Sequence, residues 1–381
     1  MIIERRHDID WLRVLAIGLL LIYHVAIAFQ PWGVFIGFIQ SNEPIEAIWI
    51  PMSILNIWRI PLLFFVSGMG VWFAIQRRDW IQLLAERSRR ILLPYIFGIL
   101  AIVPLHIFLW QDYYTQEIKY VPNPAHLWFL GNIFVYVILL SPVFFYLKRN
   151  RQGPIGHFVK RLLANQWSLL LLMIPFILEG IISAPQEYEM YAMTWHGFAL
   201  GLVAFCTGFC CVFAGSVFWN NVKKQRWMLF THAVIFYLIR LLFFELRTPD
   251  YLMAVESCLW IFTVFGFGYR HLNQPSKALE YLSQAAYPVY IIHMIFIYIG
   301  CYVLFPMNVS SFGTFIIVNI FTFVGSMMMY ELLIRRVRFL RPLFGLQIHK
   351  KRNDRFGDTK SSSKAYDSPG NRKIDIQTME S

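Results

Sequence analysis

Apolar residues follow one another in long unbroken blocks, without the period of two or 3.6 that marks half-buried strands and helices in soluble proteins. A helix of about 20 apolar residues crosses the hydrocarbon layer of a membrane. Ten stretches of this kind predict ten transmembrane helices, at residues 11–29, 46–75, 91–110, 126–147, 167–184, 193–218, 229–246, 251–269, 285–305 and 312–333. The predicted fold class is an all-α integral membrane protein, since the strands of a membrane barrel alternate apolar and polar residues.

The second stretch, 46–75, is too long for one straight span and contains Pro51 and Pro61. Proline removes a backbone N–H and bends or breaks a helix. We expect a kinked helix here, or an interfacial turn that leads into the span. The first stretch carries Arg13 and His24, and no small-residue cleavage site follows it, so we expect it to remain in the protein.

The composition agrees with a membrane protein, because 57% of the 381 residues are hydrophobic and only 15% are charged, against about 25% charged in soluble domains. The net charge of +12 arises mainly in loops on the side of the termini, while the opposite loops hold only Lys119 and Arg247. By the positive-inside rule, both termini are predicted to be cytoplasmic. Since the basic charge is mostly topological, a nucleic-acid partner is not expected, which leaves membrane lipids or a phosphorylated cofactor.

The end of the chain differs from the rest in composition. Residues 349–381 are polar, basic and rich in serine, which predicts a disordered cytoplasmic tail after one transmembrane domain at residues 1–348. The five cysteines all lie in apolar stretches and show no metal-ligand spacing with histidine. We therefore expect them to be packing residues, and we predict no metal site.

Ionisable residues at membrane depth are the strongest functional signal in such a sequence, because each is unfavourable there unless it is paired or hydrated. In the first stretch, Arg13 and His24 are eleven residues apart. At 100° per residue they project from one face of a helix, about 16 Å apart along its axis. The pair predicts a row of functional side chains along one face of the first helix. In the structural alternative, Arg13 reaches the lipid headgroups and His24 bonds to a neighbouring helix.

Arg59 lies about midway along the second stretch, where a guanidinium stays charged and must meet an anion, a carbonyl group or water. One interpretation pairs it with a membrane carboxylate, Glu256 or Glu245. The other uses it to hold an anionic group of a substrate, and the sequence leaves both open. The glycines that follow, Gly68 and Gly70, indicate close packing of helices.

Arginines also gather just before the third stretch, as Arg87, Arg89 and Arg90. We expect a helix to begin near Leu93 and Pro94, which would place these guanidinium groups at a helix N-terminus, a setting that suits phosphate. The alternative is a positively charged anchor at the cytoplasmic surface.

Two later motifs add histidines. The fourth stretch opens with His126 and Trp128 on the side opposite the termini, where an aromatic belt accounts for the tryptophan but does not require the histidine. The ninth contains Tyr290 and His293, about 12 Å from the cytoplasmic side. Together with the first helix, they predict a polar path across the membrane. Glu256, in the eighth stretch, is a candidate counter-charge for the buried arginine or a partner that orients the first histidine.

Taken in order, these motifs resemble those of the membrane acyltransferase 3 family. The resemblance covers most of residues 8–345 and rests on the Arg13–His24 spacing, RIPLLFFVSG, Arg87-x-x-Arg90 ahead of Pro94, HLWFL and Tyr290-x-x-His293. Within the family, the pattern is most similar to the glucan biosynthesis protein C branch, a glucan-modifying succinyltransferase. The five motifs in this order are specific for the family and much less specific for the substrate.

The resemblance implies a ten-helix O-acyltransferase in a bacterial cytoplasmic membrane. Such an enzyme takes an acetyl or succinyl group from cytoplasmic acyl-CoA, its donor substrate, and transfers it to a hydroxyl of a cell-envelope carbohydrate. Arg87 and Arg90 match the family motif that would hold the phosphates of CoA, and Arg13 would lie along the path from these phosphates to His24.

The resemblance also assigns the chemistry to the first two helices. His24 would act as general base on the acceptor hydroxyl, as suits a group with an ordinary pKa of about 6.5, or would carry the acyl group transiently. Arg59 would stabilise the oxyanion on the thioester carbonyl or hold an acidic acyl chain. The remaining candidates, for contact with the acceptor or for support of catalysis, are His126, Trp128, Glu256, Tyr290 and His293.

Two other functions fit parts of the same pattern. A transporter or flippase for an envelope glycan precursor would also have ten spans with buried arginines and histidines, but it has no need of the cytoplasmic arginine pair. A family member that has lost catalysis and serves as an assembly subunit has no need of both Arg13 and His24. The oligomeric state is not predicted by the sequence.

Overall fold

The chain folds into a bundle of helices. The computed structural model describes residues 5–165, 167–307 and 309–347, and within these ranges it contains helices and turns but no strand. The α-helices are α1 (His7–Ile27), α2 (Trp49–Ile75), α3 (Trp80–Arg87), α4 (Leu93–Phe97), α5 (Val103–Tyr113), α6 (Trp128–Arg149), α7 (Pro154–Ala164), α8 (Ser168–Ser183), α9 (Trp195–Ala214), α10 (Ser216–Phe243), α11 (Asp250–His271), α12 (Lys277–Leu304), α13 (Ser311–Met329) and α14 (Leu340–Leu343). Short 3-10 or π segments are η1 (Gly33–Ile36), η2 (Glu46–Ile48), η3 (Ser88–Leu92), η4 (Gly98–Ile102), η5 (Ala125–Leu127) and η6 (Tyr330–Ile334).

Nine helical segments among the described residues are long and apolar enough to cross a membrane, and the bent pair α7 and α8 is a candidate for a tenth. Each of the ten predicted stretches overlaps one of these segments, so the prediction of an all-α multi-pass membrane protein is confirmed. The predicted tail at residues 349–381 lies outside the described residues. The side of the membrane on which the termini lie stays a prediction.

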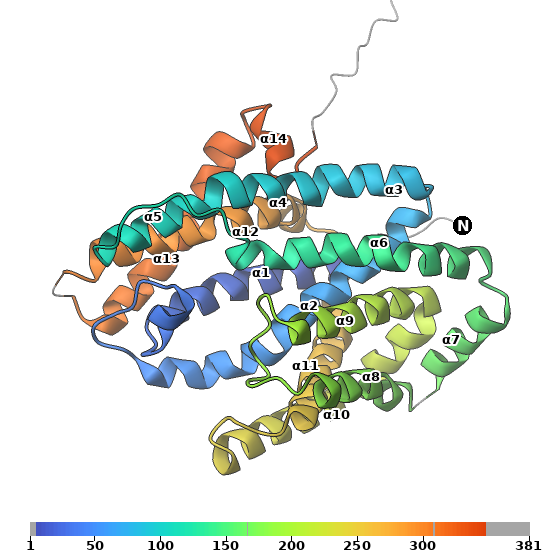
Figure 1. The fold of residues 1–381 in the computed structure, drawn as a ribbon. Helices are drawn as coiled ribbons and strands as arrows, with labels where there is room; N and C mark the ends of the chain where they lie inside the picture. The colour runs from blue at the N-terminus through green and yellow to red at the C-terminus, as the bar shows by residue number, and fades with distance from the viewer. Residues whose placement is uncertain (1–4, 166, 308, 348–381) are drawn as a thin grey trace, which may run out of the picture. The chain divides into compact units, whose positions relative to one another are not determined.

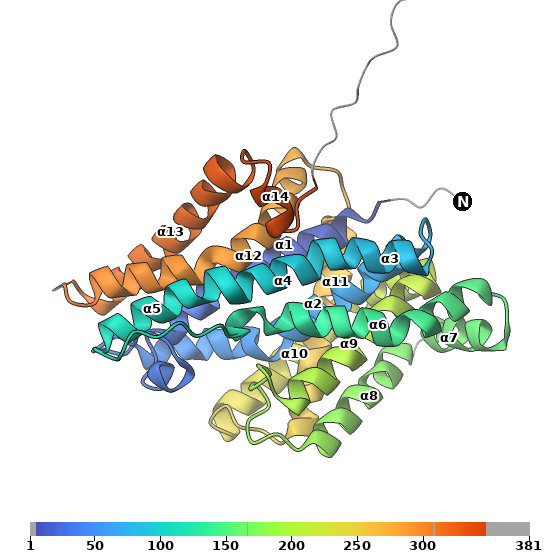
Figure 2. The ribbon, with the colours of Figure 1, turned by 45° about the horizontal axis from the view of Figure 1, so that its top comes forward.

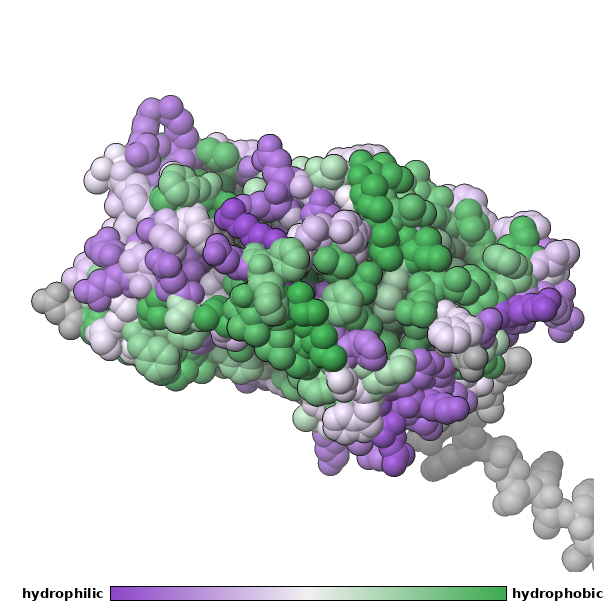
Figure 3. Space-filling model, turned by 90° about the horizontal axis from the view of Figure 1, so that it is seen from below, coloured by the Kyte–Doolittle hydropathy of each residue, from purple (hydrophilic) through white to green (hydrophobic). Residues whose placement is uncertain are grey.

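The surface carries the apolar side chains that a membrane protein needs. Figure 3 shows hydrophobic residues over the middle of one face, with hydrophilic residues gathered toward its ends. Large apolar side chains also point outward from α10 and α13, among them Leu242 and Ile320. Apolar exposure on this scale is favourable in hydrocarbon and unfavourable in water, so these helices present lipid-facing surfaces.

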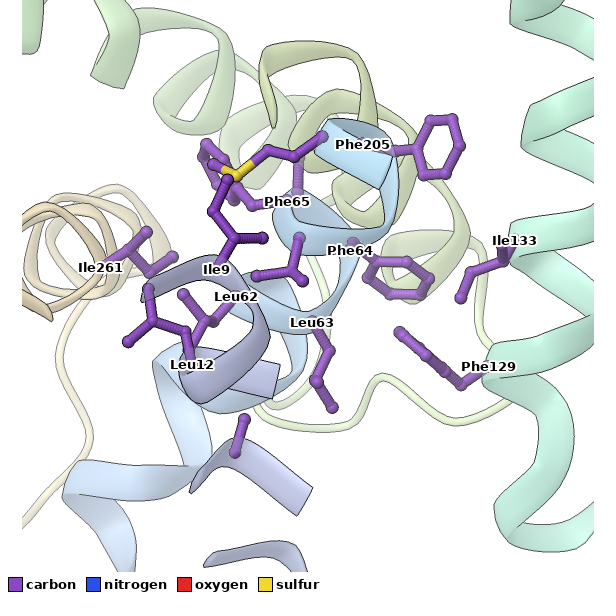
Figure 4. Close-up of a cluster of buried hydrophobic side chains, with 14 of the residues drawn as sticks. Ile9, Leu12, Leu62, Leu63, Phe64, Phe65, Phe129, Ile133, Phe205 and Ile261 are labelled. Atoms are coloured by element: carbon purple, nitrogen blue, oxygen red, sulfur yellow. The ribbon is translucent and has the colours of Figure 1, made fainter. Parts of the chain in front are cut away.

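The helix α2 lies at the centre of the bundle, in contact with α1, α9 and α11. Its residues 62–65 belong to the buried apolar cluster drawn in Figure 4. Gly68 faces the backbone of Phe205 in α9, and Gly208 of α9 faces the backbone of Phe65, so that a Cβ atom at either glycine would clash with a carbonyl oxygen. The prediction that Gly68 permits close helix packing is confirmed.

The helix α2 continues through Pro61 because neighbouring segments bond the carbonyl group that this proline leaves free. Proline has no N–H to donate to the carbonyl oxygen of Ile57, four residues earlier. Ser257 Oγ donates to that oxygen at 2.7 Å, and Tyr191 Oη donates to it at 3.2 Å. Of the two predicted arrangements, the structure has a short turn, η2, that leads into one continuous α-helix.

The run from α3 to α5 differs from the prediction. It is helical throughout, with the π-helical turns η3 and η4 between the α-helices (Figure 1). The predicted helix start near Leu93 and Pro94 is therefore wrong, because the wider turn of η3 precedes the proline and lets the helix pass through it. The helix begins instead after Asp79, whose side chain accepts a hydrogen bond from the backbone N–H of Gln82.

Candidate active site

The helices α1 and α12 lie side by side and bring two histidines together (Figures 1 and 2). His24, near the end of α1, places its Nδ1 at 2.8 Å from Nε2 of His293 in α12, and the two ring planes are nearly parallel. His293 is fully buried, and its Nδ1 lies 2.7 Å from the carbonyl oxygen of Tyr290. Candidate residues of the first and ninth predicted stretches thus form one polar group.

The hydrogen bonds of the neutral histidine pair determine where its protons lie. A carbonyl oxygen only accepts, so Nδ1 of His293 carries the proton that is donated to Tyr290, and Nε2 of His293 is left as an acceptor. His24 therefore donates through Nδ1, and its Nε2 holds a free lone pair. No described residue forms a hydrogen bond with this Nε2, and His24 is only half-buried. The pair thus presents an oriented imidazole that can accept a proton.

Arg59 is buried against Tyr23, the residue before His24, and has unfilled hydrogen-bond donors. It is only 1% exposed, and its Cζ lies 3.9 Å from the ring centroid of Tyr23, which precedes His24 in α1. Its Nε and Nη1 have no hydrogen-bond partner among the described residues. A buried guanidinium with unpaired N–H groups is suited to hold an anion or an oxyanion that develops during a reaction.

The predicted carboxylate partner of Arg59 is bound by another arginine. Glu256 accepts from Nε of Arg240 at 2.7 Å and from Nη2 at 3.1 Å, in a buried bidentate pair. The interpretation in which Glu256 neutralises Arg59 or orients His24 is therefore wrong, because both of its oxygens are occupied. Neither Glu245 nor any other carboxylate of the described residues forms an ion pair with Arg59.

A third histidine extends the group. Nε2 of His126 lies 3.1 Å from the carbonyl oxygen of Ile291, in the middle of α12, and its ring meets that of His293 edge-on with centroids 5.2 Å apart. The hydroxyl of Tyr290 donates to the carbonyl oxygen of His126. His126 was expected at the membrane interface, but it lies deeper, because the connection that precedes it turns back into the bundle along α5 (Figures 1 and 2).

Trp128 also lies inside the bundle. It is 9% exposed, and its ring packs against that of Phe64 in α2. Such a position fits a packing residue, whereas a tryptophan of an aromatic belt reaches the lipid headgroups. The prediction that Trp128 lies at the interface is wrong, because α6 begins within the bundle.

Two further residues of this group, His106 and Tyr298, are not among those predicted from the sequence. His106, on α5, is 3% exposed, and the centroid of its ring lies 5.7 Å from that of His126 and 4.9 Å from that of Tyr298. A signal for His106 was present, because a histidine inside the third apolar stretch is an ionisable group at membrane depth. Tyr298 gives no such signal, since only the fold brings it beside the histidines.

The predicted phosphate-binding arginines gather toward the opposite end of α1. Glu86 lies 3.3 Å from Nη1 of Arg90 and 4.0 Å from Nε of Arg87. Arg87 also donates through Nη2 to the carbonyl oxygen of Gly70 at 3.4 Å, and Arg13 approaches the same glycine. Glu86 faces both Arg87 and Arg90, and Asp10 lies 3.7 Å from Nη1 of Arg13, so three arginines meet two carboxylates and a surplus of positive charge remains that suits phosphate. These arginines lie within the run from α3 to α5 and not at a helix N-terminus.

The arginine cluster (Arg13, Arg87 and Arg90) and the histidine pair (His24 and His293) lie along the same face of α1, but apolar residues fill the space between them. Arg13 and His24 are about 16 Å apart along this helix. Ile17 and Leu20 occupy the face between them and are buried in the apolar core. The predicted polar path is therefore interrupted in this structure.

Among the described residues, no group of three or more His, Cys, Asp or Glu side chains is arranged to hold a metal ion. The arrangement supplies an imidazole that can accept a proton and a cation with unfilled N–H donors. Together these groups suit reactions in which a hydroxyl is deprotonated and an oxyanion forms.

A family model matches most of the chain. It is the acyltransferase 3 model, described as an acyltransferase domain, and it spans residues 6–331. No curated protein and no solved structure matches the chain. The matched range contains the histidine pair, the buried Arg59 and the arginine cluster. The chain therefore belongs to the acyltransferase 3 family of membrane acyltransferases.

Proposed function

We propose that the protein transfers an acyl group from acyl-CoA, bound at the arginine cluster, to a carbohydrate hydroxyl at the histidine pair. The observation that carries the proposal is the hydrogen-bonded pair of His24 and His293, which leaves Nε2 of His24 free to accept a proton, while the unfilled donors of Arg59 lie against Tyr23, the preceding residue. A base and an oxyanion-stabilising cation are the two parts that acyl transfer to a hydroxyl needs.

His24 is the general base in this proposal. Its Nε2 takes the proton of the acceptor hydroxyl while the hydroxyl oxygen attacks the thioester carbon. As the new C–O bond forms, the C–S bond breaks, and the proton passes from His24 to the sulfur of CoA. His293 positions the imidazole by accepting the hydrogen bond from Nδ1. In the alternative, Nε2 itself attacks the thioester and a transient acyl-histidine forms.

Arg59 stabilises the charge that develops in this step. The thioester carbonyl oxygen becomes negative when the hydroxyl attacks, and the Nε and Nη1 donors of Arg59 are available to it. A succinyl donor carries a second anion, which would occupy part of the same guanidinium, whereas an acetyl donor would not. Both acyl groups therefore fit the proposal, and the glucan biosynthesis protein C resemblance favours succinyl.

Arg87 and Arg90, with Arg13, hold the phosphates of CoA in this proposal, because Glu86 neutralises only part of their charge. We place this end of the bundle in the cytoplasm of a bacterial cell, since most basic residues outside the spans are predicted on that side. The acceptor is then a carbohydrate of the cell envelope that reaches the histidine pair from the other side of the cytoplasmic membrane.

Acyl transfer by the purified protein in nanodiscs tests the proposal, with radiolabelled acetyl-CoA and succinyl-CoA as donors. We expect His24→Ala to lower release and transfer of the label by at least about 100-fold while CoA binding, measured by calorimetry, is kept. Arg13→Ala should weaken CoA binding instead. His232→Ala is the matched control, because His232 is exposed on α10 and hydrogen-bonds only within its own helix.

Two results would overturn the proposal. If wild-type protein neither binds CoA nor consumes either thioester, the protein is not a CoA-dependent acyltransferase, and transport of an envelope glycan precursor becomes the function to test. If the thioesters are consumed equally by wild type and by His24→Ala with an intact fold, acyl transfer stands but His24 is not its base.

A further inference from the structure

The connection between α5 and α6 has an unusual conformation for its place in the molecule. Residues 116–124 are extended and contain no helical turn, and most of them are exposed. Non-glycine residues in the left-handed region stand near both ends, Thr115 at φ 51° and Ala125 at φ 40°. Both views of the ribbon show the connection running back along α5 toward the middle of the bundle, where α6 begins (Figures 1 and 2).

Two contacts show how far this segment runs back from the ends of the neighbouring helices. The hydroxyl of Tyr120 donates to the carbonyl oxygen of Leu100 at 2.8 Å, and Leu100 lies 13 residues, or about 20 Å, before the end of α5 at Tyr113. At the far end of the segment, His126 bonds to the carbonyl oxygen of Ile291, which likewise lies 13 residues, or about 20 Å, before the end of α12. Measured from these helix ends, the segment reaches back along the bundle by more than half the thickness of a hydrocarbon layer, which is about 30 Å.

An extended backbone at this depth conflicts with a lipid environment. The backbone N–H groups of Glu117, Ile118, Tyr120 and Val121 have no hydrogen-bond partner among the described residues. Lys119 is an exception, since its N–H donates to Oε1 of Gln111. Irregular backbone at membrane depth is tolerated only where protein covers it or water reaches it. Because Glu117, Lys119 and Tyr120 are more than half exposed, no described part of the chain covers them.

The segment also leads directly to the proposed catalytic residues. It ends at Asn123, whose Oδ1 accepts from the N–H of Ala125, and His126 follows immediately. The ring of His126 contacts His293, which is the hydrogen-bond partner of His24. A molecule lying along residues 116–123 would thus have its inner end beside the histidine group.

We propose that residues 116–123 line a water-filled entrance on the side opposite the arginine cluster and bind the acceptor, a chain of sugar units, along their unpaired backbone groups. The identity of the occupant rests on the proposed function, which requires a hydroxyl at His24. A sugar chain offers donors and acceptors along its whole length, which match unpaired N–H and C=O groups, and its flatter faces suit the exposed ring of Tyr120. A lipid tail would leave these backbone groups unpaired.

Cysteine labelling tests the entrance without relying on activity. Ile118→Cys and Ile320→Cys form a matched pair, because Ile118 is 61% exposed on the segment and Ile320 is 58% exposed on the lipid-facing side of α13. The two positions also lie at similar depth, about 15 Å from the same end of the bundle. The reagent is a positively charged, membrane-impermeant methanethiosulfonate. Wild-type protein, whose described cysteines are free and none exposed, gives the background rate.

We expect Ile118→Cys in nanodiscs to react at least about tenfold faster than Ile320→Cys, because the reagent requires water at the thiol. Equal, slow rates for the two variants would overturn the proposal. In the second arm, a linear glucose oligosaccharide of about six units is added, and it should slow labelling of Ile118→Cys several-fold without changing the rate of Ile320→Cys.

The two arms separate the parts of the inference. Fast labelling that an extended peptide slows and the oligosaccharide does not would show that the segment docks a peptide, and would overturn the assignment of a carbohydrate. Fast labelling that neither probe slows would likewise overturn it. Consumption of labelled acyl-CoA, measured on the same preparation, reports separately on the proposed function, since labelling needs no catalysis.

Discussion

Two arginines buried in the same bundle have opposite surroundings. Arg240 is fully buried, and its guanidinium bonds both oxygens of Glu256 and the carbonyl oxygen of Ser53. Arg59 is as deeply buried, yet its Nε and Nη1 have no hydrogen-bond partner among the described residues. Burial of a charge therefore does not by itself distinguish a structural arginine from a functional one.

The difference lies in whether carboxylates neutralise the cation, since Nη1 of Arg240 also lacks a hydrogen-bond partner but lies 3.8 Å from Oε1 of Glu189, in addition to the pair with Glu256. Through Glu256 and Ser53, Arg240 ties α10 to α11 and α2. Removal of one partner of such a pair leaves the other charge uncompensated. Arg59 keeps donors that only water, an anion or a developing oxyanion can fill. The comparison predicts that Arg240 supports the fold and that Arg59 supports the reaction.

The largest expected effect is the loss of stability in Arg240→Met. Because the variant leaves the Glu256 carboxylate buried and unpaired, we expect it to lose about 3–5 kcal/mol of stability and to show a clearly lower thermal unfolding midpoint in detergent. The double variant Arg240→Met, Glu256→Met should recover most of this loss, since the buried Glu256 carboxylate is removed together with its partner and only the more exposed Glu189 loses an ion pair. An Arg240→Met variant that unfolds at the wild-type temperature would contradict a structural role.

Substitution of His293 is expected to have the next largest effect, on catalysis. His293→Ala removes the acceptor that fixes the tautomer of His24, so we expect the rate of acyl transfer to fall about 100-fold at unchanged CoA affinity. His293→Gln should restore part of the rate, because an amide oxygen can accept from Nδ1 of His24. Equal rates for the alanine and glutamine variants would contradict this positioning role.

The arginine cluster offers a third case beside the two buried arginines, because its residues are partly exposed and are proposed to bind the acyl-CoA donor. Arg87→Gln and Arg90→Gln each remove a charged hydrogen-bond donor, and we expect each to weaken CoA binding about tenfold in calorimetry. Arg89→Gln is the matched control, since Arg89 is exposed and makes no ion pair among the described residues. A loss at Arg89 equal to that at Arg87 would show that general positive charge, and not this cluster, attracts the donor.

The smallest expected effect concerns the carbonyl group that Pro61 leaves free. Ser257→Ala removes the shorter of the two hydrogen bonds to the carbonyl oxygen of Ile57, while Tyr191 still donates to it. We expect a loss of about 1 kcal/mol in stability and a small fall in the thermal midpoint. No change in acyl transfer should accompany it, and a large catalytic defect would place this bond in the reaction mechanism.

The fold was largely predictable from the sequence, because the length and apolar composition of a stretch are enough to identify a membrane helix. The errors arose where neighbouring helices decide the local structure. The helix start expected near Pro94 was wrong because a π-helical turn lets the helix continue through it. The interface position expected for His126 and Trp128 was wrong because the preceding connection folds inward, which no hydropathy pattern records.

The candidate site was predictable in part. Helical spacing placed Arg13 and His24 on one face, but it could not show that His24 meets His293, since the two are 269 residues apart in the sequence. The partner of Glu256 was also assigned wrongly, because Arg240 and Arg59 look alike as single basic residues in apolar stretches. Which arginine a carboxylate reaches depends on how the helices pack, and this packing cannot be derived from a single sequence.

The most direct test of the contrast between the two arginines is Arg59→Met, with acyl transfer and thermal unfolding measured on the same preparation. We predict that transfer from labelled acyl-CoA falls by about 100- to 1,000-fold, as for the loss of an oxyanion donor. The unfolding midpoint should stay at or above that of wild type, because no paired charge is broken. A variant that keeps transfer, or that unfolds as early as Arg240→Met, would contradict the catalytic assignment of Arg59.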